Sequence, residues 1–379
     1  MTRAAREPGT SLTVELDAIA HNLAAVRSLL EPGMRVAGVV KADAYGHGML
    51  PVSRRLLAEG VEALAVALLS EARVLRKGGI AAPVMVLTDP WPDRAGEVVA
   101  LGVMPVIDRW QTLKALAAAG DAAGRTVRCL LKVDTGMGRL GVEPRQALEF
   151  LERAAPLRGV ELVGLVSHLA TAGEPGDAHA ARQTRRFAEL LAQARRQGFA
   201  LPDSSLCASG GSLVPPPVAP GPPCLVRVGI ALYGGLPSPG SRGVAQLRTA
   251  MRFATRLHAV RPLRAGQPVS YGCTWSAPED TWLGVLPVGY ADGYPRAASN
   301  RAQVLIRGRR VPVRGRVCMN LMMVELAGLE PLPQPGEEVV LLGRQGKEEI
   351  TLDQLGGWAG TIGYEVACAL GAANPPLHV

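Results

Sequence analysis

The sequence has few aromatic residues and no long apolar run. Phe, Trp and Tyr make up 4% of its 379 residues, and no segment approaches the roughly 20 apolar residues that a membrane-spanning helix needs. The first residues also lack the apolar core of a secretory signal, so we expect a cytoplasmic protein without a membrane partner. The six cysteines are scattered, with no CxxC pair and no cysteine–histidine cluster, so no metal site is expected.

Lysine is the scarcest charged residue. Lys and Arg number 41 against 33 Asp and Glu, a net charge of +8, yet only five of these cations are lysines. An arginine-rich segment at 307–316 alternates with Val, Ile and Pro like a strand with one solvated face, and there are few aromatics to stack on bases, so we expect no nucleic-acid partner. Arginine stays protonated and cannot readily form an imine. A rare lysine at the end of a strand is therefore a candidate catalytic group.

Short apolar runs alternate with amphipathic helical stretches between residues 34 and 233, which predicts repeated βα units. The runs are residues 34–40, 63–68, 84–87, 103–107, 127–133, 162–167, 205–208 and 225–230. Eight such units predict an α/β fold with a (β/α)₈ barrel of the TIM type over residues 1–245. An open, doubly wound sheet is the alternative, because a count of strands cannot show closure.

The pattern changes after about residue 245. Short segments rich in Pro, Gly, Val and Arg replace the helical periodicity, which predicts a second, mainly antiparallel β-domain over 246–379 with a last short helix near 353–357. The proline-rich stretch at 215–223 falls between the seventh and eighth barrel strands and is expected to be a surface loop.

Two of the rare lysines lie at the carboxyl ends of predicted barrel strands. Lys41 comes directly after the first run and opens a segment that contains two glycines, and Lys132 lies near the end of the run 127–133, before a glycine-rich loop that holds Arg139. The carboxyl ends of barrel strands are where active sites collect, so both lysines are expected at the mouth of the barrel.

An anion site is also expected at this mouth, because the loops after the last two strands of a barrel commonly bind phosphate through backbone amides. Ser209 and two glycines follow the seventh run, and Gly229 and Ile230 end the eighth, with Arg227 just inside it. Together they predict a phosphate-binding site close to an arginine inside the barrel.

At this point the sequence resembles the alanine racemases, through ordered motifs that cover essentially the whole chain. The motifs are VVKADAYGHG (39–48), LKVDTGMGRLGV (131–142), SHLATA (167–172), VRVGIALYG (226–234), VSYG (269–272), and later GYADGYPR, GRVCMN and TIGYEV. The resemblance implies an enzyme that interconverts L- and D-alanine with pyridoxal 5'-phosphate (PLP) and so supplies D-alanine for peptidoglycan.

The resemblance also implies residue roles. Lys41 would bind PLP covalently as an imine, and Arg139 and the backbone amide of Met319 would hold the substrate carboxylate. The residues implied for the PLP phosphate are Tyr45, Ser209, Gly229, Ile230 and Tyr364. Tyr364 at the substrate pocket favours a small side chain such as that of alanine, and a racemase that accepts serine is the alternative.

Racemisation requires two bases, one on each face of the α-carbon. Lys41 would serve one face, and the resemblance places Tyr271 of a partner subunit on the other, which implies a homodimer. A phenol with a pKa of about 10 needs neighbours that favour its phenolate, a role that the resemblance gives to His168 and Arg227.

The resemblance also places Arg227 at the pyridine nitrogen of PLP, where it would be a fixed donor that limits side reactions. A PLP barrel decarboxylase would carry an acid there. That enzyme, a broad-specificity racemase and a non-catalytic PLP-binding barrel are the alternatives.

Lys132 needs a separate explanation, because its charge would lie beside that of Arg139 in a partly buried site. Some alanine racemases carbamylate the equivalent lysine with carbon dioxide, which turns a cation into an anion that orients the arginine. We expect the same of Lys132, and the alternative is an ordinary lysine paired with Asp134.

Overall fold

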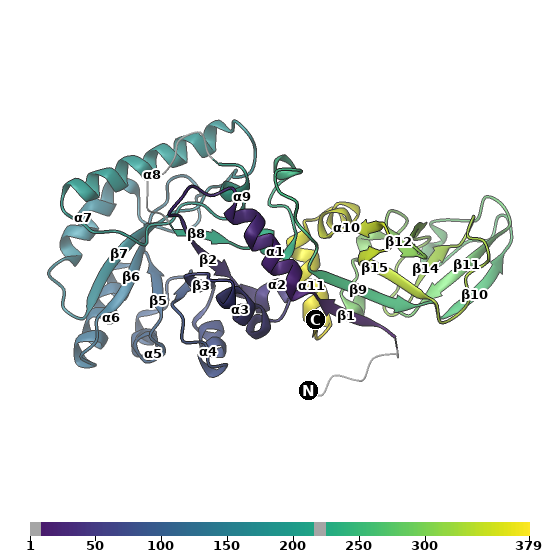
Figure 1. Ribbon diagram of the computed structural model, residues 1–379, viewed down its shortest axis with the longest axis horizontal. Helices are drawn as coiled ribbons and strands as arrows, with labels where there is room; N and C mark the ends of the chain where they lie inside the picture. The colour runs from purple at the N-terminus through teal and green to yellow at the C-terminus, as the bar shows by residue number, and fades with distance from the viewer. Residues whose placement is uncertain (1–8, 216–224) are drawn as a thin grey trace.

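The computed structural model describes residues 9–215 and 225–379, which form an elongated molecule with two lobes (Figure 1). The elements from α1 to β8 build one lobe, and most of the elements from β9 onward build the other. Nearly all of the loop expected at 215–223 lies outside the described residues.

The first lobe contains a sheet of seven parallel strands in the order β7-β6-β5-β4-β3-β2-β8. The strands are β2 (Arg35–Val39), β3 (Ala63–Val66), β4 (Val84–Val86), β5 (Met104–Ile107), β6 (Val127–Lys132), β7 (Val160–Val166) and β8 (Leu225–Val228). The helices that precede or follow them are α1 (Leu16–Arg27), α2 (Lys41–Gly46), α3 (Met49–Ala58), α4 (Leu69–Lys77), α5 (Ala95–Leu101), α6 (Trp110–Ala122), α7 (Pro144–Ala154), α8 (Ala178–Arg196) and α9 (Ser209–Leu213). This is the predicted βα alternation.

The sheet closes into a barrel through residues 204–208, which run between β7 and β8. Ser205 bridges Val166 and Ala208 bridges Arg227, both in parallel, with backbone hydrogen bonds of 2.8 to 3.0 Å. The predicted barrel is therefore confirmed and the open sheet is wrong. The seventh predicted strand, however, is present only as these two bridges.

The barrel strands are buried on both faces, because helices cover the outside and the strands face one another inside. All residues of β3, β4, β5 and β8 are buried. Such strands have nearly continuous apolar sequences rather than alternating ones, which is why they were visible as short apolar runs.

The second lobe is built from antiparallel pairings, as predicted. Its larger sheet has the order β13-β12-β15-β9-β1-β17, with β16 paired to β15, and its smaller sheet has the order β10-β11-β14. The strands are β1 (Ser11–Val14), β9 (Met251–Arg256), β10 (Ala259–Leu263), β11 (Thr281–Leu286), β12 (Gln303–Ile306), β13 (Arg309–Pro312), β14 (Met322–Glu325), β15 (Glu338–Gln345), β16 (Glu348–Ile350) and β17 (Leu377–His378). Strand β1 precedes the whole barrel in sequence, yet it pairs with β9 and, in parallel, with β17.

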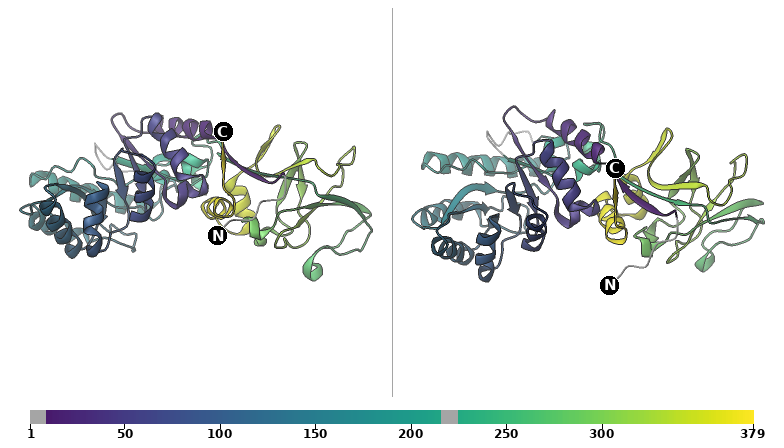
Figure 2. Two further views of the ribbon diagram at one scale, coloured as in Figure 1. Left: turned by 90° about the horizontal axis from the view of Figure 1, so that it is seen from below. Right: turned by 60° about the horizontal axis from the view of Figure 1, so that its bottom comes forward.

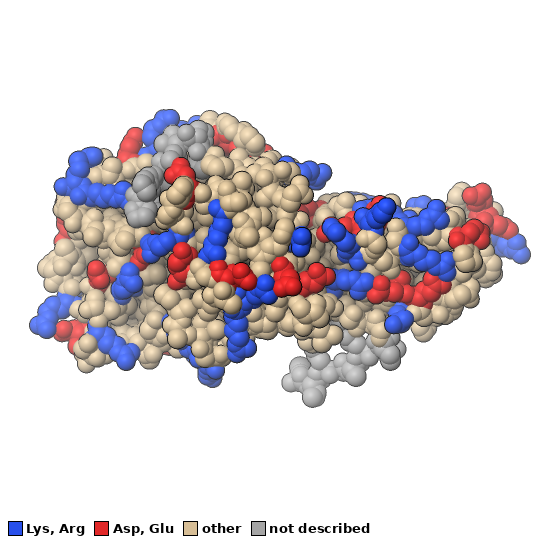
Figure 3. Space-filling model, viewed as in Figure 1, with Lys and Arg blue, Asp and Glu red and all other residues tan. Residues whose placement is uncertain are grey.

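The arginine-rich segment 307–316 contains the β13 strand, and acids neutralise part of its charge. Arg310 pairs with Glu348 at 2.6 Å and Arg314 with Glu325 at 2.8 Å. On the face of the molecule in Figure 3, cationic and anionic side chains are interspersed along both lobes.

Two helices lie between the lobes, as both views in Figure 2 show. The short helix expected near 353–357 is α10 (Leu352–Ala359), and α11 (Gly363–Ala373) was not predicted. Helix α11 packs backbone to backbone against α2, since a Cβ on Gly46 would lie 2.5 Å from the Ala367 carbonyl oxygen. None of the described helices is long and apolar enough to cross a membrane.

Candidate active site

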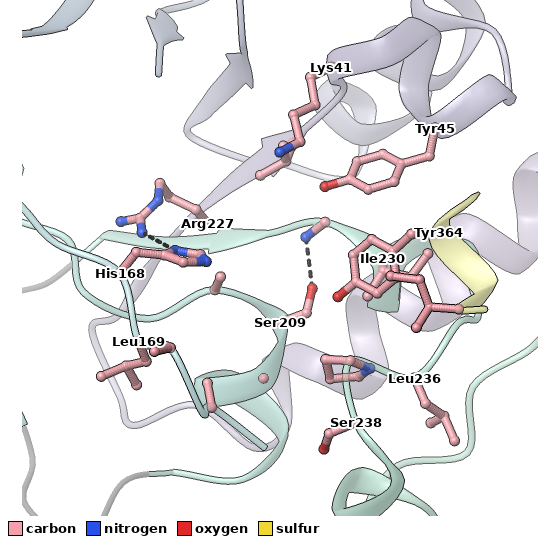
Figure 4. A pocket seen from close by; sticks show the side chains of 18 of the residues that line it. Lys41, Tyr45, His168, Leu169, Ser209, Arg227, Ile230, Leu236, Ser238 and Tyr364 are labelled. Carbon is pink, nitrogen blue, oxygen red and sulfur yellow. Dashed lines mark hydrogen bonds between the residues drawn. The ribbon is translucent and has the colours of Figure 1, made fainter. Parts of the chain in front are cut away.

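A cavity of about 950 Å³ opens at the carboxyl ends of the barrel strands (Figure 4). Its wall contains every predicted site residue of the barrel, together with one tyrosine of α11. These residues are Lys41, Tyr45, Lys132, Arg139, His168, Ser209, Arg227, Gly229, Ile230 and Tyr364. The tertiary structure therefore gathers side chains from six separate segments of the chain into one site.

Lys41 lies two positions after the end of β2 and begins a turn with a left-handed backbone. Residues 42–45 all have φ between 52 and 56°, which costs non-glycine residues roughly 1–2 kcal/mol each because Cβ crowds the carbonyl. The Glu71 carboxylate helps to hold the turn by accepting a hydrogen bond from the Ala42 N–H at 2.6 Å. The turn brings the Lys41 Nζ to 5.9 Å from the centroid of the Tyr45 ring.

Two phenols lie at one end of the cavity. The Tyr45 ring centroid is 5.0 Å from that of Tyr233 and 6.0 Å from that of Tyr364. A Cβ on Gly229 would lie 2.5 Å from the Tyr45 Oη, so this close approach requires glycine. Burial raises the pKa of Tyr45 and raises the pKa of Tyr364 to about 12. Both phenols therefore stay protonated and are available to donate hydrogen bonds to an anion.

Ser209 lies at the same end of the cavity, at the start of α9. Its Oγ accepts hydrogen bonds from the Gly229 N–H at 2.9 Å and the Ala231 N–H at 3.3 Å, the first of which is drawn in Figure 4. The hydroxyl group, the backbone of the loop after β8 and the two phenols together form a cradle of neutral donors, which suits a phosphate group.

Arg227 and His168 lie on the opposite side of the cavity from Tyr45, with the Lys41 amine between them (Figure 4). Arg227 is only 4% exposed, and its guanidinium donates to the Ser205 Oγ, the Ser167 carbonyl at 2.8 Å and the His168 Nδ1 at 3.3 Å.

Burial lowers the pKa of Arg227 to about 10, so the group remains a cation at neutral pH. Burial and then the charge of Arg227 lower the pKa of His168 to about 3. The imidazole is therefore neutral, and its Nδ1 is free to accept the hydrogen bond.

Lys41 and Lys132 both have pKa values below that of an ordinary lysine. Burial, followed by the charges of Arg227 and Arg139, lowers the pKa of Lys132 to about 7. Burial and then Arg139 lower the pKa of Lys41. A larger fraction of each side chain is therefore the neutral amine, which is the form that acts as a nucleophile or a base.

The Asp134 carboxylate, the expected partner of Lys132 in the simplest interpretation, is engaged elsewhere. It accepts hydrogen bonds of 2.7 to 3.2 Å from the backbone N–H groups of residues 136–138. Its charge still raises the pKa of Lys132, but less than burial and the two arginines lower it.

Tyr271 and Met319 do not line this cavity. Both belong to loops of the second lobe, where Tyr271 is 70% exposed and Met319 is 55% exposed. Within one chain the structure therefore separates these two predicted residues from the other site residues.

Sequence reasoning missed parts of the wall that come from distant segments. Asp353 on α10 lines the cavity and accepts a hydrogen bond from the Leu236 N–H at 3.0 Å. The sequence signal there was the capping box of Thr351 and Gln354, which marks the start of a helix but not its position over the barrel.

Comparison with protein families identifies both lobes. Residues 14–237 match the alanine racemase N-terminal domain, and residues 250–377 match the alanine racemase C-terminal domain. The chain belongs to the alanine racemase family. Family members are isomerases, so the cavity is the candidate active site of an isomerase.

Individual alanine racemases are similar over nearly the whole chain. The alanine racemase of Symbiobacterium thermophilum is 41% identical over 365 residues, which cover 96% of either protein. That of Desulforamulus reducens is 36% identical over 97% of this chain and 98% of its own length.

Solved alanine racemase structures have the same fold across both lobes. The enzyme from D-cycloserine-producing Streptomyces lavendulae superposes with a TM-score of 0.90 at 33% identity, covering 99% of this chain and 98% of that one. The enzyme from Bacillus anthracis with bound L-Ala-P gives a TM-score of 0.86 at 30% identity, covering 99% and 96%.

Proposed function

We propose that this member of the alanine racemase family interconverts L-alanine and D-alanine with PLP and two bases. The observation that supports this most strongly is the combination, in one cavity, of a lysine with a lowered pKa, a buried arginine and a cradle of neutral donors. Tyr364 in the wall of the cavity favours a substrate with a small side chain, such as alanine.

The residues fit PLP. Tyr45, Ser209, Tyr364 and the loop after β8 would hold its phosphate, and the missing Cβ of Gly229 leaves room for the Tyr45 phenol. Lys41 would hold the cofactor covalently. When bound, the cofactor supplies a conjugated ring that withdraws electrons from the substrate and acidifies its Cα proton.

Arg227 would donate a hydrogen bond to the pyridine nitrogen of the cofactor. Its pKa of about 10 is still far above neutrality, so it would donate without giving up its proton. A carboxylic acid in the same place would protonate the ring and strengthen the withdrawal of electrons. The arginine therefore favours simple proton exchange over reactions that need a long-lived carbanion.

The substrate carboxylate would lie against Arg139, which lines the cavity, with the backbone amide of the partner's Met319 as a second donor. The Lys41 Nζ would exchange a proton at one face of the α-carbon, and the lowered pKa of this lysine increases the fraction of free amine. The partner subunit's Tyr271 would exchange a proton at the other face, with His168 and Arg227 favouring its phenolate.

A homodimer is part of this proposal. The exposure of Tyr271 and Met319 supports it, because large apolar side chains of 70% and 55% exposure are available to a second copy of the chain. We further propose that the chain divides near residue 245 into a barrel domain and a β-domain that completes the partner's site. A cytoplasmic location and the supply of D-alanine for peptidoglycan stay predictions.

The direct test is an assay of L-alanine to D-alanine conversion with and without added PLP. We expect racemisation of alanine, dependence on PLP after the cofactor is released with hydroxylamine and dialysed away, and much slower turnover of serine and arginine because of Tyr364. Equal rates for arginine and alanine would contradict the assignment as an alanine racemase and indicate a broad-specificity enzyme.

We also propose that Lys132 is carbamylated. Its neutral amine would attack carbon dioxide, so that the N–C bond forms, one C–O π bond becomes the carboxylate, and the nitrogen releases one proton to solvent. With a pKa of about 7, most of the side chain is the reactive amine above pH 7 and the protonated, unreactive form below it. The resulting carbamate would place a negative charge near Arg139, where the protonated lysine would place a positive one.

Lys132→Ala is expected to lower kcat/KM for alanine by about 10- to 100-fold, since a charge-assisted interaction that orients Arg139 is lost. Acetate should restore part of the activity by occupying the place of the carbamate. The matched control is Lys114→Ala on α6, whose exposed side chain should not affect kcat/KM. NMR of protein prepared with isotope-labelled bicarbonate detects the carbamate; no labelled signal, together with no acetate rescue, would leave Lys132 an ordinary lysine.

A further inference from the structure

A carboxylate outside the cavity is bonded to the loop that carries Arg139. Asp108 follows β5 and is half-buried, and its Oδ2 accepts a hydrogen bond from the Gly141 N–H at 2.9 Å. Asp108 does not line the cavity, so any effect on the reaction must act through the loop.

The Arg139 loop is anchored at its base. The Val142 N–H donates to the Lys132 carbonyl at 3.0 Å, and the Asp134 N–H donates to the Val142 carbonyl at 2.9 Å. The Asp134 carboxylate then fixes the backbone N–H groups of residues 136–138. These contacts hold residues 134–138, which precede Arg139, and Val142, which follows it by three positions.

On the carboxyl-terminal side, the first side-chain anchor after Arg139 is the bond to Gly141. Gly141 has φ of +124°, and a Cβ there would lie 2.7 Å from the Asp134 nitrogen, so the two arms of the loop touch at this glycine. The loop is thus narrow at Gly141, and the bond to Asp108 fixes its distance from β5.

Asp108 is itself held in place by Asp89, which lies three positions after the end of β4. The Asp89 Oδ2 accepts hydrogen bonds from the Asp108 N–H at 2.9 Å and the Arg109 N–H at 3.1 Å. The Arg109 guanidinium pairs with Asp89 at 3.0 Å, and the Asp89 side chain is only 7% exposed. The anchor is therefore bonded to a residue of the loop that follows the neighbouring strand β4.

The two carboxyl groups also contact each other. Burial, and then the hydrogen bond and charge of Asp89, raise the pKa of Asp108. The Asp108 Oδ2 remains the acceptor for the Gly141 N–H, and this hydrogen bond is the contact that fixes the loop. An asparagine at this position would keep an oxygen that accepts the Gly141 N–H but would carry no charge.

We propose that Asp108 is a positioning residue. Its bond to Gly141 holds the Arg139 loop in the position from which Arg139 reaches the carboxylate of the substrate. This inference rests on the proposed role of Arg139 as the carboxylate-binding residue. It concerns binding of the substrate, so it predicts an effect on KM that is larger than the effect on kcat.

The test compares Asp108→Ala with Asp108→Asn. Both remove the carboxylate charge that raises the pKa of Lys132, so the pair differs in the hydrogen bond to Gly141. We expect Asp108→Ala to raise KM for alanine, and the inhibition constant of propionate, by about tenfold. Asp108→Asn should stay within about twofold of the wild type, because its amide oxygen still accepts the Gly141 N–H.

Two controls make the result specific. Asp121→Ala removes an exposed carboxylate near the end of α6 and should leave KM unchanged. Asp108→Ser, whose hydroxyl is too short to keep the bond, replaces the alanine variant should that protein be recovered unfolded. The cofactor absorbance of each variant confirms that the site is loaded.

Arg139→Gln separates the inference from the proposed function. If Arg139→Gln raises KM while Asp108→Ala does not, the inference is wrong and the role of Arg139 stands. If the asparagine and alanine variants are equally impaired, the charge of Asp108 rather than its bond to Gly141 matters, and the inference is again wrong. An unchanged KM in Arg139→Gln would overturn the assignment of Arg139 and the inference with it.

Discussion

Tyr271→Phe is expected to slow the racemisation of L-alanine and D-alanine alike by about 10²- to 10⁴-fold, the usual contribution of a general acid–base group. Each direction of the reaction needs one proton removed and one delivered, so the loss of either base blocks both directions. The Lys41 amine is untouched, and the purified variant should keep the yellow absorbance of lysine-bound PLP. Rates measured separately from each enantiomer, together with the absorbance spectrum, check the result.

Exchange with solvent gives a sharper measurement of the same variant. In deuterated water, Lys41 should still exchange the Cα proton of the one enantiomer whose proton faces it, without racemisation. Lys41→Ala should lose both the absorbance and the exchange. Tyr294→Phe is the matched control, because it removes a buried hydroxyl of the same lobe that has no hydrogen-bond partner among the described residues. A wild-type rate for Tyr271→Phe would refute the two-base assignment.

The second large effect is the recovery of activity on mixing two inactive variants. If each site combines the barrel of one chain with Tyr271 of the other, a heterodimer of Lys41→Ala and Tyr271→Phe chains contains one intact site and one doubly defective site. Random exchange of equal amounts makes half of the dimers mixed, so about one quarter of all sites should become wild type. Activity measured before and after exchange should rise from background to about that fraction.

The control for this experiment is exchange demonstrated independently, with differently tagged chains isolated as mixed dimers. Mixing Lys41→Ala with Arg227→Ala chains should restore nothing, because both residues line the cavity of the same barrel. Mixed dimers of Lys41→Ala and Tyr271→Phe that stay inactive would place Tyr271 in the site of its own chain, in conflict with the proposed dimer.

Several features of this protein were determined by sequence alone. The apolar runs predicted the barrel, because strands buried on both faces need continuous apolar segments. The scarcity of lysine pointed to Lys41 and Lys132, because imine and carbamate chemistry require an amine that arginine cannot supply. The glycine and serine loops after the last strands predicted the position of the anion cradle.

Some elements were not visible in the sequence because their residues are small. The buried positions of α11 are Gly363, Val366, Ala367 and Leu370, which do have helical spacing. Glycine and alanine, however, give a weak apolar signal, and their advantage is close packing against Gly46. Closure of the barrel was not visible in the sequence either. It depends on isolated bridges from Ser205 and Ala208 to residues elsewhere in the chain, which no local pattern shows.

Only the tertiary structure decided which charges meet. The pKa of about 7 for Lys132 comes from burial and from two arginines that lie 7 and 95 positions further along the chain, and no local pattern contains that sum. The bond from Asp108 to Gly141 joins loops 33 positions apart, and the exposure of Tyr271 away from its own cavity depends on how the two lobes are placed. The physical reason is the same throughout: residue type fixes what a side chain is able to do, whereas burial and the charges of distant neighbours fix its protonation, its orientation and its partner.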